Sequence, residues 1–91
     1  MSKYQQKVTI VNKLGLHARA ATKLAKLTQK FKAAITLQLD DKHAQADSIM
    51  ALMLLTGSQG KAVLVTAEGD DAQAALDAVE QLVNDRFDES E

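Results

Sequence analysis

The stretch that decides the fold is KVTIVNKLGLHARAA, residues 7–21. Its first five residues alternate and include four β-branched side chains, which predicts a strand over residues 7–11. Residues 12–15 then have turn chemistry, and a helix is expected to begin near Ala18. A strand, a glycine-containing turn and a helix therefore follow one another within a short segment, and His17 lies at the last junction.

The helix that begins near Ala18 is predicted to have an apolar face and a basic face. Residues at spacings of three and four form the stripe expected to face the core, namely Ala21, Leu24, Ala25, Thr28 and Phe31. Basic residues with a similar period form an exposed ridge that starts beside His17, the basic ridge of Arg19, Lys23, Lys26 and Lys30.

A hairpin and a short helix are predicted next. Apolar residues alternate over 35–39, Asp40 and Asp41 favour a turn, and a short strand is expected near residues 43–46. Asp47 and Ser48 are suitable N-cap residues for the apolar run 49–55, which two glycines follow.

A fourth strand over residues 61–67 and a last helix complete the chain. The apolar residues between Ala72 and Val83 keep helical spacing, and Asp70 with Gln73 is expected to form a capping box. The order βαββαβα predicts one α+β domain over residues 1–91, in which three helices cover one face of a four-stranded, largely antiparallel sheet.

The apolar run 49–55 raises a packing problem, because a helix that packs on a sheet buries only one face. If Leu52 and Leu55 point into the core, then Ile49, Met50 and Met53 are partly exposed, and such a patch marks a docking surface. The alternative is that the whole run is buried.

Composition and charge exclude several classes of protein. The chain has 91 residues and no cysteine, so disulfides, thiolate metal sites and cysteine nucleophiles are excluded, and neither a membrane span nor a secretion signal is recognisable. The net charge is −1, but residues 1–32 hold eight Lys and Arg with no acidic residue, whereas residues 33–91 hold three against twelve carboxylates. The near-neutral total therefore hides a strong charge asymmetry.

His17 has a location with specific electrostatics. A helix N-terminus carries unpaired N–H groups and roughly half a positive charge, so it attracts phosphate and favours the neutral, nucleophilic form of an imidazole. Arg19 can neutralise a phosphoryl group carried on His17, and the backbone N–H of Ala18 can donate to its oxygens. An exposed helix cap without any chemistry has the same spacing, so the spacing alone leaves both interpretations open.

The run GLHARAA after a first strand resembles the active-site motif of the histidine-containing phosphocarrier (HPr) family of the bacterial phosphotransferase system. The segment DSIMAL at 47–52 is similar to the regulatory-serine segment of that family, and SQG at 58–60 with AEGD at 67–70 also matches. The resemblance covers roughly residues 5–85. It implies an open-faced β-sandwich.

The resemblance also implies a mechanism and partners. His17 would accept a phosphoryl group on Nδ1 from phosphorylated Enzyme I and pass it to an EIIA-type protein, as a carrier in a relay rather than a stand-alone enzyme. No cofactor and no metal are expected. We expect a cytoplasmic monomer that docks through the basic ridge and through Ile49, Met50 and Met53, and that binds neither nucleic acid nor membrane.

Ser48 has two interpretations. As an N-cap it would contribute about 1 kcal/mol of stability. The matching serine of the family can be phosphorylated by a dedicated HPr kinase, which would add about −1.5 to −2 charges beside the docking patch.

One position departs from the family pattern, which usually has proline where Ala20 stands. Alanine is structurally harmless there and returns one backbone donor, so transfer is expected to survive. The HARAA run and the C-terminal residues 84–89 favour the nitrogen-related branch of the family over the sugar-uptake branch, whose chemistry would be identical. A nucleic-acid-binding module is the distant alternative, but only Tyr4, Phe31 and Phe87 are aromatic, so no stacking platform is recognisable.

Overall fold

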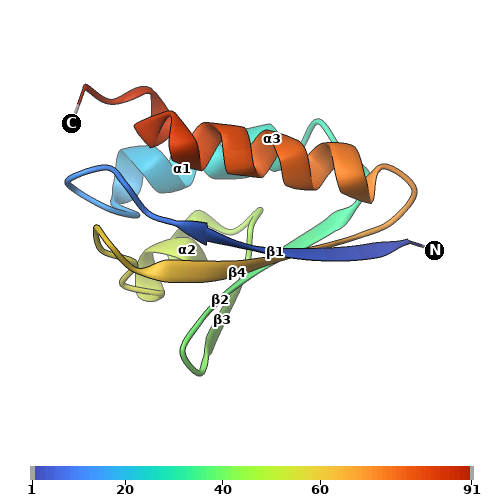
Figure 1. Ribbon diagram of the computed structural model, residues 1–91, viewed down its shortest axis with the longest axis horizontal. Coiled ribbons are helices and arrows are strands. Elements are labelled where there is room, and N and C mark those ends of the chain that lie inside the picture. The colour runs from blue at the N-terminus through green and yellow to red at the C-terminus, as the bar shows by residue number, and fades with distance from the viewer. Residues whose placement is uncertain (1, 91) are drawn as a thin grey trace.

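The computed structural model describes residues 2–90, which form one sheet with helices packed on it (Figure 1). The strands are β1 (Lys3–Thr9), β2 (Ala34–Leu39), β3 (Lys42–Gln45) and β4 (Ala62–Glu68). Their order in the sheet is β1-β4-β2-β3, and every neighbouring pair is antiparallel. The helices are α1 (Ala18–Thr28), α2 (Ile49–Leu54) and α3 (Ala72–Asn84), followed by the short turn η1 (Arg86–Asp88). The predicted element order and fold class are confirmed.

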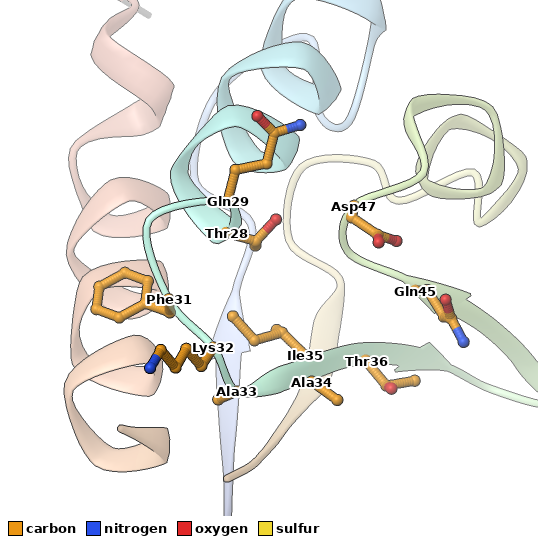
Figure 2. Close-up of a pocket in the computed structure, with 10 residues that line it drawn as sticks. All are labelled: Thr28, Gln29, Phe31, Lys32, Ala33, Ala34, Ile35, Thr36, Gln45 and Asp47. Carbon is orange, nitrogen blue, oxygen red and sulfur yellow. The ribbon is translucent and has the colours of Figure 1, made fainter. Parts of the chain in front are cut away.

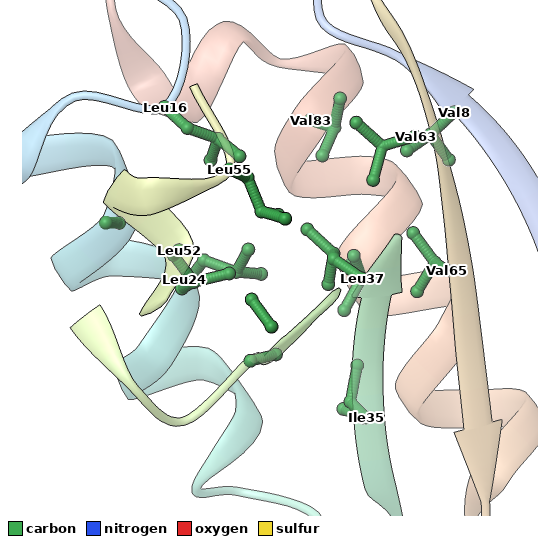
Figure 3. Close-up of a cluster of buried hydrophobic side chains, with 14 of the residues drawn as sticks. Val8, Leu16, Leu24, Ile35, Leu37, Leu52, Leu55, Val63, Val65 and Val83 are labelled. Carbon is green, nitrogen blue, oxygen red and sulfur yellow. The ribbon is translucent and has the colours of Figure 1, made fainter. Parts of the chain in front are cut away.

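The core lies between the sheet and the helices. In Figure 3, Ile35 and Leu37 of β2 and Val63 and Val65 of β4 point toward helix residues such as Leu24. The helix α3 packs across β1 and β4 beside α1, while α2 packs against α1 and β3. The alternation of buried and exposed residues along β2 and β4 follows from the period of two in a strand. None of the helices among residues 2–90 has the length and apolar composition needed to cross a bilayer.

The first strand differs from the prediction of residues 7–11. It begins at Lys3 and ends at Thr9, because the polar residues before Val8 pair with β4 from Glu68 onward. Ile10 leaves the regular ladder but still donates its N–H to the carbonyl of Lys61 (2.9 Å). Ladder hydrogen bonding therefore outweighs the weak strand propensity of Gln5 and Gln6.

The predicted capping box of Asp70 and Gln73 is wrong. The helix α3 has Asp71 as its N-cap residue, and the Asp71 carboxylate accepts hydrogen bonds from the backbone N–H groups of Lys32 and Ala33 (both 2.8 Å) instead of capping α3. Gln73 donates to Asp77 (2.9 Å). Asp71 therefore ties the start of α3 to the segment before β2. Phe31, expected in the core stripe, lies beyond the end of α1 and is only partly buried.

Candidate functional site

The loop before α1 fixes the position of His17. Gly15 has a φ of +66°, and a Cβ there would lie 2.2 Å from the carbonyl oxygen of Gly57, so only glycine fits. The N–H of Leu16 donates to the same carbonyl (2.8 Å). The loop after α2 thus supports the loop that carries His17.

His17 is the N-cap residue of α1 and lies, as predicted, at the junction between the glycine turn and the helix. Its backbone is extended, its side chain makes no capping hydrogen bond, and its carbonyl accepts the N–H of Ala21 (2.9 Å). Within residues 2–90, the N–H groups of Ala18, Arg19 and Ala20 have no hydrogen-bond acceptor. Three free donors and the positive end of the helix dipole therefore lie beside the imidazole.

The His17 ring is held from the other side by the C-terminal segment, which the sequence did not predict. The ring nitrogen Nε2 is in close contact with Oε2 of Glu89, while Asn12 Nδ2 donates to Oε1 of Glu89 (2.9 Å) and to the carbonyl of Gly15 (2.9 Å). The side chains of His17 and Glu89 are 25% and 11% exposed, so the pair is partly shielded but the ring remains accessible.

The Glu89 carboxyl is ionised at neutral pH. Burial on its own raises the pKa of Glu89, but hydrogen bonds from Asn12 and His17, with the nearby charge of Arg19, bring that pKa below its ordinary value. A carboxylate only accepts hydrogen bonds, so Glu89 accepts from both partners.

The C-terminal segment reaches His17 through a left-handed turn. Arg86, Phe87 and Asp88 have φ values of +59°, +52° and +64°, which non-glycine residues rarely adopt. Phe87 is 0% exposed, and its carbonyl accepts a hydrogen bond from Lys23 Nζ (2.8 Å). A buried aromatic ring and a lysine therefore anchor the turn against the body of the domain.

The basic ridge is exposed at Arg19, Lys26 and Lys30, as predicted, but Lys23 departs from the prediction. Its side chain is half-buried, because its ammonium group is bound to Phe87 and lies 3.8 Å from a carboxylate oxygen of Asp88. Lys13, Arg19 and Lys23 line a surface depression together with Glu89. Asp88 lines the same depression, so the ridge begins at a site of mixed charge, and Glu89 connects this site to the His17 ring.

The helix α2 exposes an apolar surface, as the packing problem required. Leu52 and Leu55 are buried, whereas Ile49 and Met53 are each 40% exposed and Met50 is 70% exposed. Leu14 and Leu54, which the sequence analysis did not single out, are also exposed, at 65% and 66%. Ser48 is the N-cap residue of α2, and its hydroxyl oxygen accepts the N–H of Ala51 (3.2 Å).

A second pocket lies at the opposite end of α1 from His17 (Figure 2). Thr28, Gln29 and Phe31 line it from α1 and its end, Gln45 lines it from the end of β3, and Asp47 lines it from the segment after β3. It contains neither His17 nor Arg19, so the free helix N-terminus and the imidazole belong to a different part of the surface.

A sequence model of the family described as "PTS HPr component phosphorylation site" matches residues 4–85. The chain belongs to the HPr family. It is 50% identical to the "Phosphocarrier protein NPr" of Shewanella violacea, with 99% of each chain covered, and 41% identical to the "Phosphocarrier protein HPr" of Xylella fastidiosa, with 93% of this chain and 96% of that protein covered.

A solved structure supports the assignment of the HPr fold. The crystal structure of HPr-C-His from Thermoanaerobacter tengcongensis superposes with a TM-score of 0.91 at 39% identity, covering 97% of this chain and 99% of that one. The HPr motif was recognisable in the sequence, but the roles of Asn12, Glu89 and the anchor Phe87 were not. The one available signal was Phe87 itself, because it is the single large apolar side chain in the polar tail 84–91.

Proposed function

We propose that this HPr-family chain is a phosphocarrier of the phosphoenolpyruvate-dependent phosphotransferase system. In this proposal His17 accepts a phosphoryl group on Nδ1 from phosphorylated Enzyme I and passes it to an EIIA-type protein. The observation that carries the proposal is the position of His17 in the GLHARAA run, beside three free N–H groups at the start of α1.

The chemistry needs presentation and charge neutralisation more than covalent help. A bond forms between Nδ1 and phosphorus while the bond between phosphorus and the donor histidine breaks, so no water and no cofactor takes part. The N–H groups of Ala18 and Arg19 can donate to the phosphoryl oxygens, and the Arg19 guanidinium offsets their charge. When the carrier passes the group on, the bond between Nδ1 and phosphorus breaks while a bond between phosphorus and the next protein forms.

Docking is proposed to use the two surfaces next to His17. The basic ridge steers an acidic partner, and the apolar surface of Ile49, Met50 and Met53 provides contact after encounter. Because charge steering is screened by salt, the association rate should fall steeply as ionic strength rises. A rate that stays flat would argue against a role for the ridge.

The nitrogen-related branch is the proposed physiological setting. The relative at 50% identity carries the NPr name, and the relative at 41% carries the HPr name, which favours that branch. The proposed localisation is the cytoplasm and the proposed state is a monomer. Ser48 is proposed to act as a helix cap, and its modification by an HPr kinase remains a separate prediction.

The test is phosphorylation by purified Enzyme I. The protein is incubated with phosphoenolpyruvate and, in turn, with the nitrogen-related and the sugar-related Enzyme I. Acid-labile, base-stable phosphate is expected on the wild type and not on His17→Ala, with His43→Ala as the matched histidine control. Label that persists in His17→Ala would refute the site, and faster labelling by the sugar-related Enzyme I would refute the branch.

A further inference from the structure

The contact between Glu89 and His17 has a chemical consequence for the ring. Because the ionised Glu89 carboxylate can only accept, the Nε2 atom that it contacts carries the proton. A neutral imidazole has one N–H, so Nδ1 then bears the lone pair. The tautomer selected by Glu89 is therefore the one that can attack phosphorus through Nδ1.

We propose that Glu89 is a positioning residue that holds His17 in the Nε2–H tautomer and supports the positive charge of the ring after Nδ1 is phosphorylated. This inference rests on the proposed phosphocarrier function. Glu89 touches the ring at the nitrogen opposite the reacting one, so it acts through His17 and not on the phosphoryl group.

The charge on the ring changes during the proposed step. When Nδ1 uses its lone pair to bond phosphorus, Nε2 keeps its proton and the ring becomes a phosphoimidazolium, while the donor histidine recovers its own lone pair and its neutral ring. No proton has to leave Nε2. The Glu89 carboxylate then faces a positive N–H, which gives a charge-assisted hydrogen bond that is roughly twice as strong as a neutral one.

The fold holds Glu89 in place at an energetic cost. Each non-glycine residue in the left-handed region is disfavoured, and three such residues follow one another at Arg86, Phe87 and Asp88. Such strain persists only where the surroundings determine the conformation. Here they do so through the fully buried Phe87 ring, the Lys23 hydrogen bond to the Phe87 carbonyl, and the Asn12 hydrogen bond to Glu89.

Asn12 ties the loop before His17 to Glu89. It is fully buried, its Nδ2 group bridges the Gly15 carbonyl and Glu89, and its Oδ1 has no hydrogen-bond partner within residues 2–90. An unsatisfied buried acceptor such as Oδ1 costs free energy, so the orientation of the Asn12 amide is explained by the two hydrogen bonds that its Nδ2 group donates. These two bonds link the His17 loop to the carboxylate that contacts the ring.

Other charged groups lie around the same depression and must be separated from Glu89 in a test. They are Arg19 and Lys23 of α1, Lys13 of the preceding loop, and Asp88. The pair Glu89→Gln and Asp85→Asn makes this separation. Both variants remove one negative charge from the C-terminal segment, but Asp85 is exposed and its carboxylate is bonded to Gln81 (2.9 Å), not to His17.

The experiment uses ¹⁵N-labelled full-length protein in two steps. First, ¹⁵N NMR of the unphosphorylated histidines reports the tautomer of His17: the wild type and Asp85→Asn are expected to show the Nε2–H form, and Glu89→Ala a mixture of both. Second, transfer from phosphorylated Enzyme I is timed. Glu89→Gln keeps the shape but loses the charge, and its transfer is expected to slow about tenfold, since the charge-assisted bond becomes a neutral one.

The outcomes separate this inference from the proposed function. If Glu89→Ala keeps the wild-type tautomer and Glu89→Gln transfers as fast as Asp85→Asn, the role of Glu89 is refuted, while transfer itself stands. If the wild type accepts no phosphate at all, the proposed function fails whatever the tautomer. Should Glu89→Ala loosen the C-terminal turn, the isosteric Glu89→Gln still decides between the outcomes.

Discussion

Truncating Phe87 should reveal how much the C-terminal turn contributes to the domain. The ring is 0% exposed and packs among the helices, with η1 in contact with both α1 and α3. Replacing a fully buried phenylalanine by alanine costs about 3 to 5 kcal/mol, from lost apolar burial and the cavity left behind. For a domain of this size each kcal/mol lowers Tm by about 4 to 8 °C, so Phe87→Ala should lower Tm by at least about 12 °C.

The assays are thermal and urea denaturation, both followed by far-UV circular dichroism, with Phe87→Leu as the matched control. Leucine keeps most of the apolar volume, so its cost should stay below about 1.5 kcal/mol. Since the same turn carries Glu89, Phe87→Ala should also shift the ¹⁵N signals of His17, whereas Phe87→Leu should leave them near the wild-type positions. A cost for Phe87→Ala below about 1 kcal/mol would refute the view that the tail is anchored in the core.

Three further predictions concern the loops and caps that shape the site. Left-handed strain alone should lower the free energy of unfolding by about 1 to 2 kcal/mol. Gly15→Ala should lower it by more than this in urea, because the new Cβ meets the Gly57 carbonyl. Gly60→Ala, also at positive φ but in open space, should lower the free energy of unfolding by no more than the strain. Ser48→Ala should lower Tm by about 4 to 8 °C through the loss of a cap worth about 1 kcal/mol, and Ser48→Asp, which can still cap, should restore most of it; equal Tm values for all three proteins would contradict the cap. The backbone N–H of Lys32 lowers the pKa of Asp71 below its ordinary value despite the opposing effect of desolvation, and the N–H of Ala33 adds to the lowering. Asp71 therefore stabilises the fold at neutral pH, and this contribution is lost as the pH falls through its folded-state pKa. Asp71→Asn should be less stable than the wild type at pH 7, with a difference that shrinks toward pH 2, and a difference independent of pH would count against the anchor.

Local patterns were enough to predict most of the fold. The helix α1 begins at Ala18 as its spacing indicated, and Asp40 and Asp41 form the turn between β2 and β3. The exposure of Ile49, Met50 and Met53 followed from geometry, because a short helix that is apolar all round cannot bury every side. Periodicity and turn chemistry act over a few residues, and these features depend on nothing more distant.

The missed features all depend on contacts between distant segments. Glu89 is separated from His17 by 72 residues, and no spacing rule connects them. The cap of α3 was predicted at Asp70, whereas the N-cap residue is Asp71, and its carboxylate accepts hydrogen bonds from two amides of the segment before β2. Lys23 fits the basic ridge by periodicity, yet the Phe87 carbonyl holds its ammonium group. The spacing of apolar and basic residues along one helix predicts the face on which a residue lies, but it does not predict which distant segment packs on that face.

The central claim is that this HPr-family protein carries a phosphoryl group on Nδ1 of His17. The most direct measurement is ³¹P and ¹⁵N NMR of the ¹⁵N-labelled protein after incubation with Enzyme I and phosphoenolpyruvate, because the coupling between phosphorus and nitrogen identifies the bonded atom. We predict one phosphoryl group, coupled to Nδ1 of His17, with Nε2 still protonated. Phosphorus coupled to Nε2, or attached to His43 or Ser48, would contradict the account.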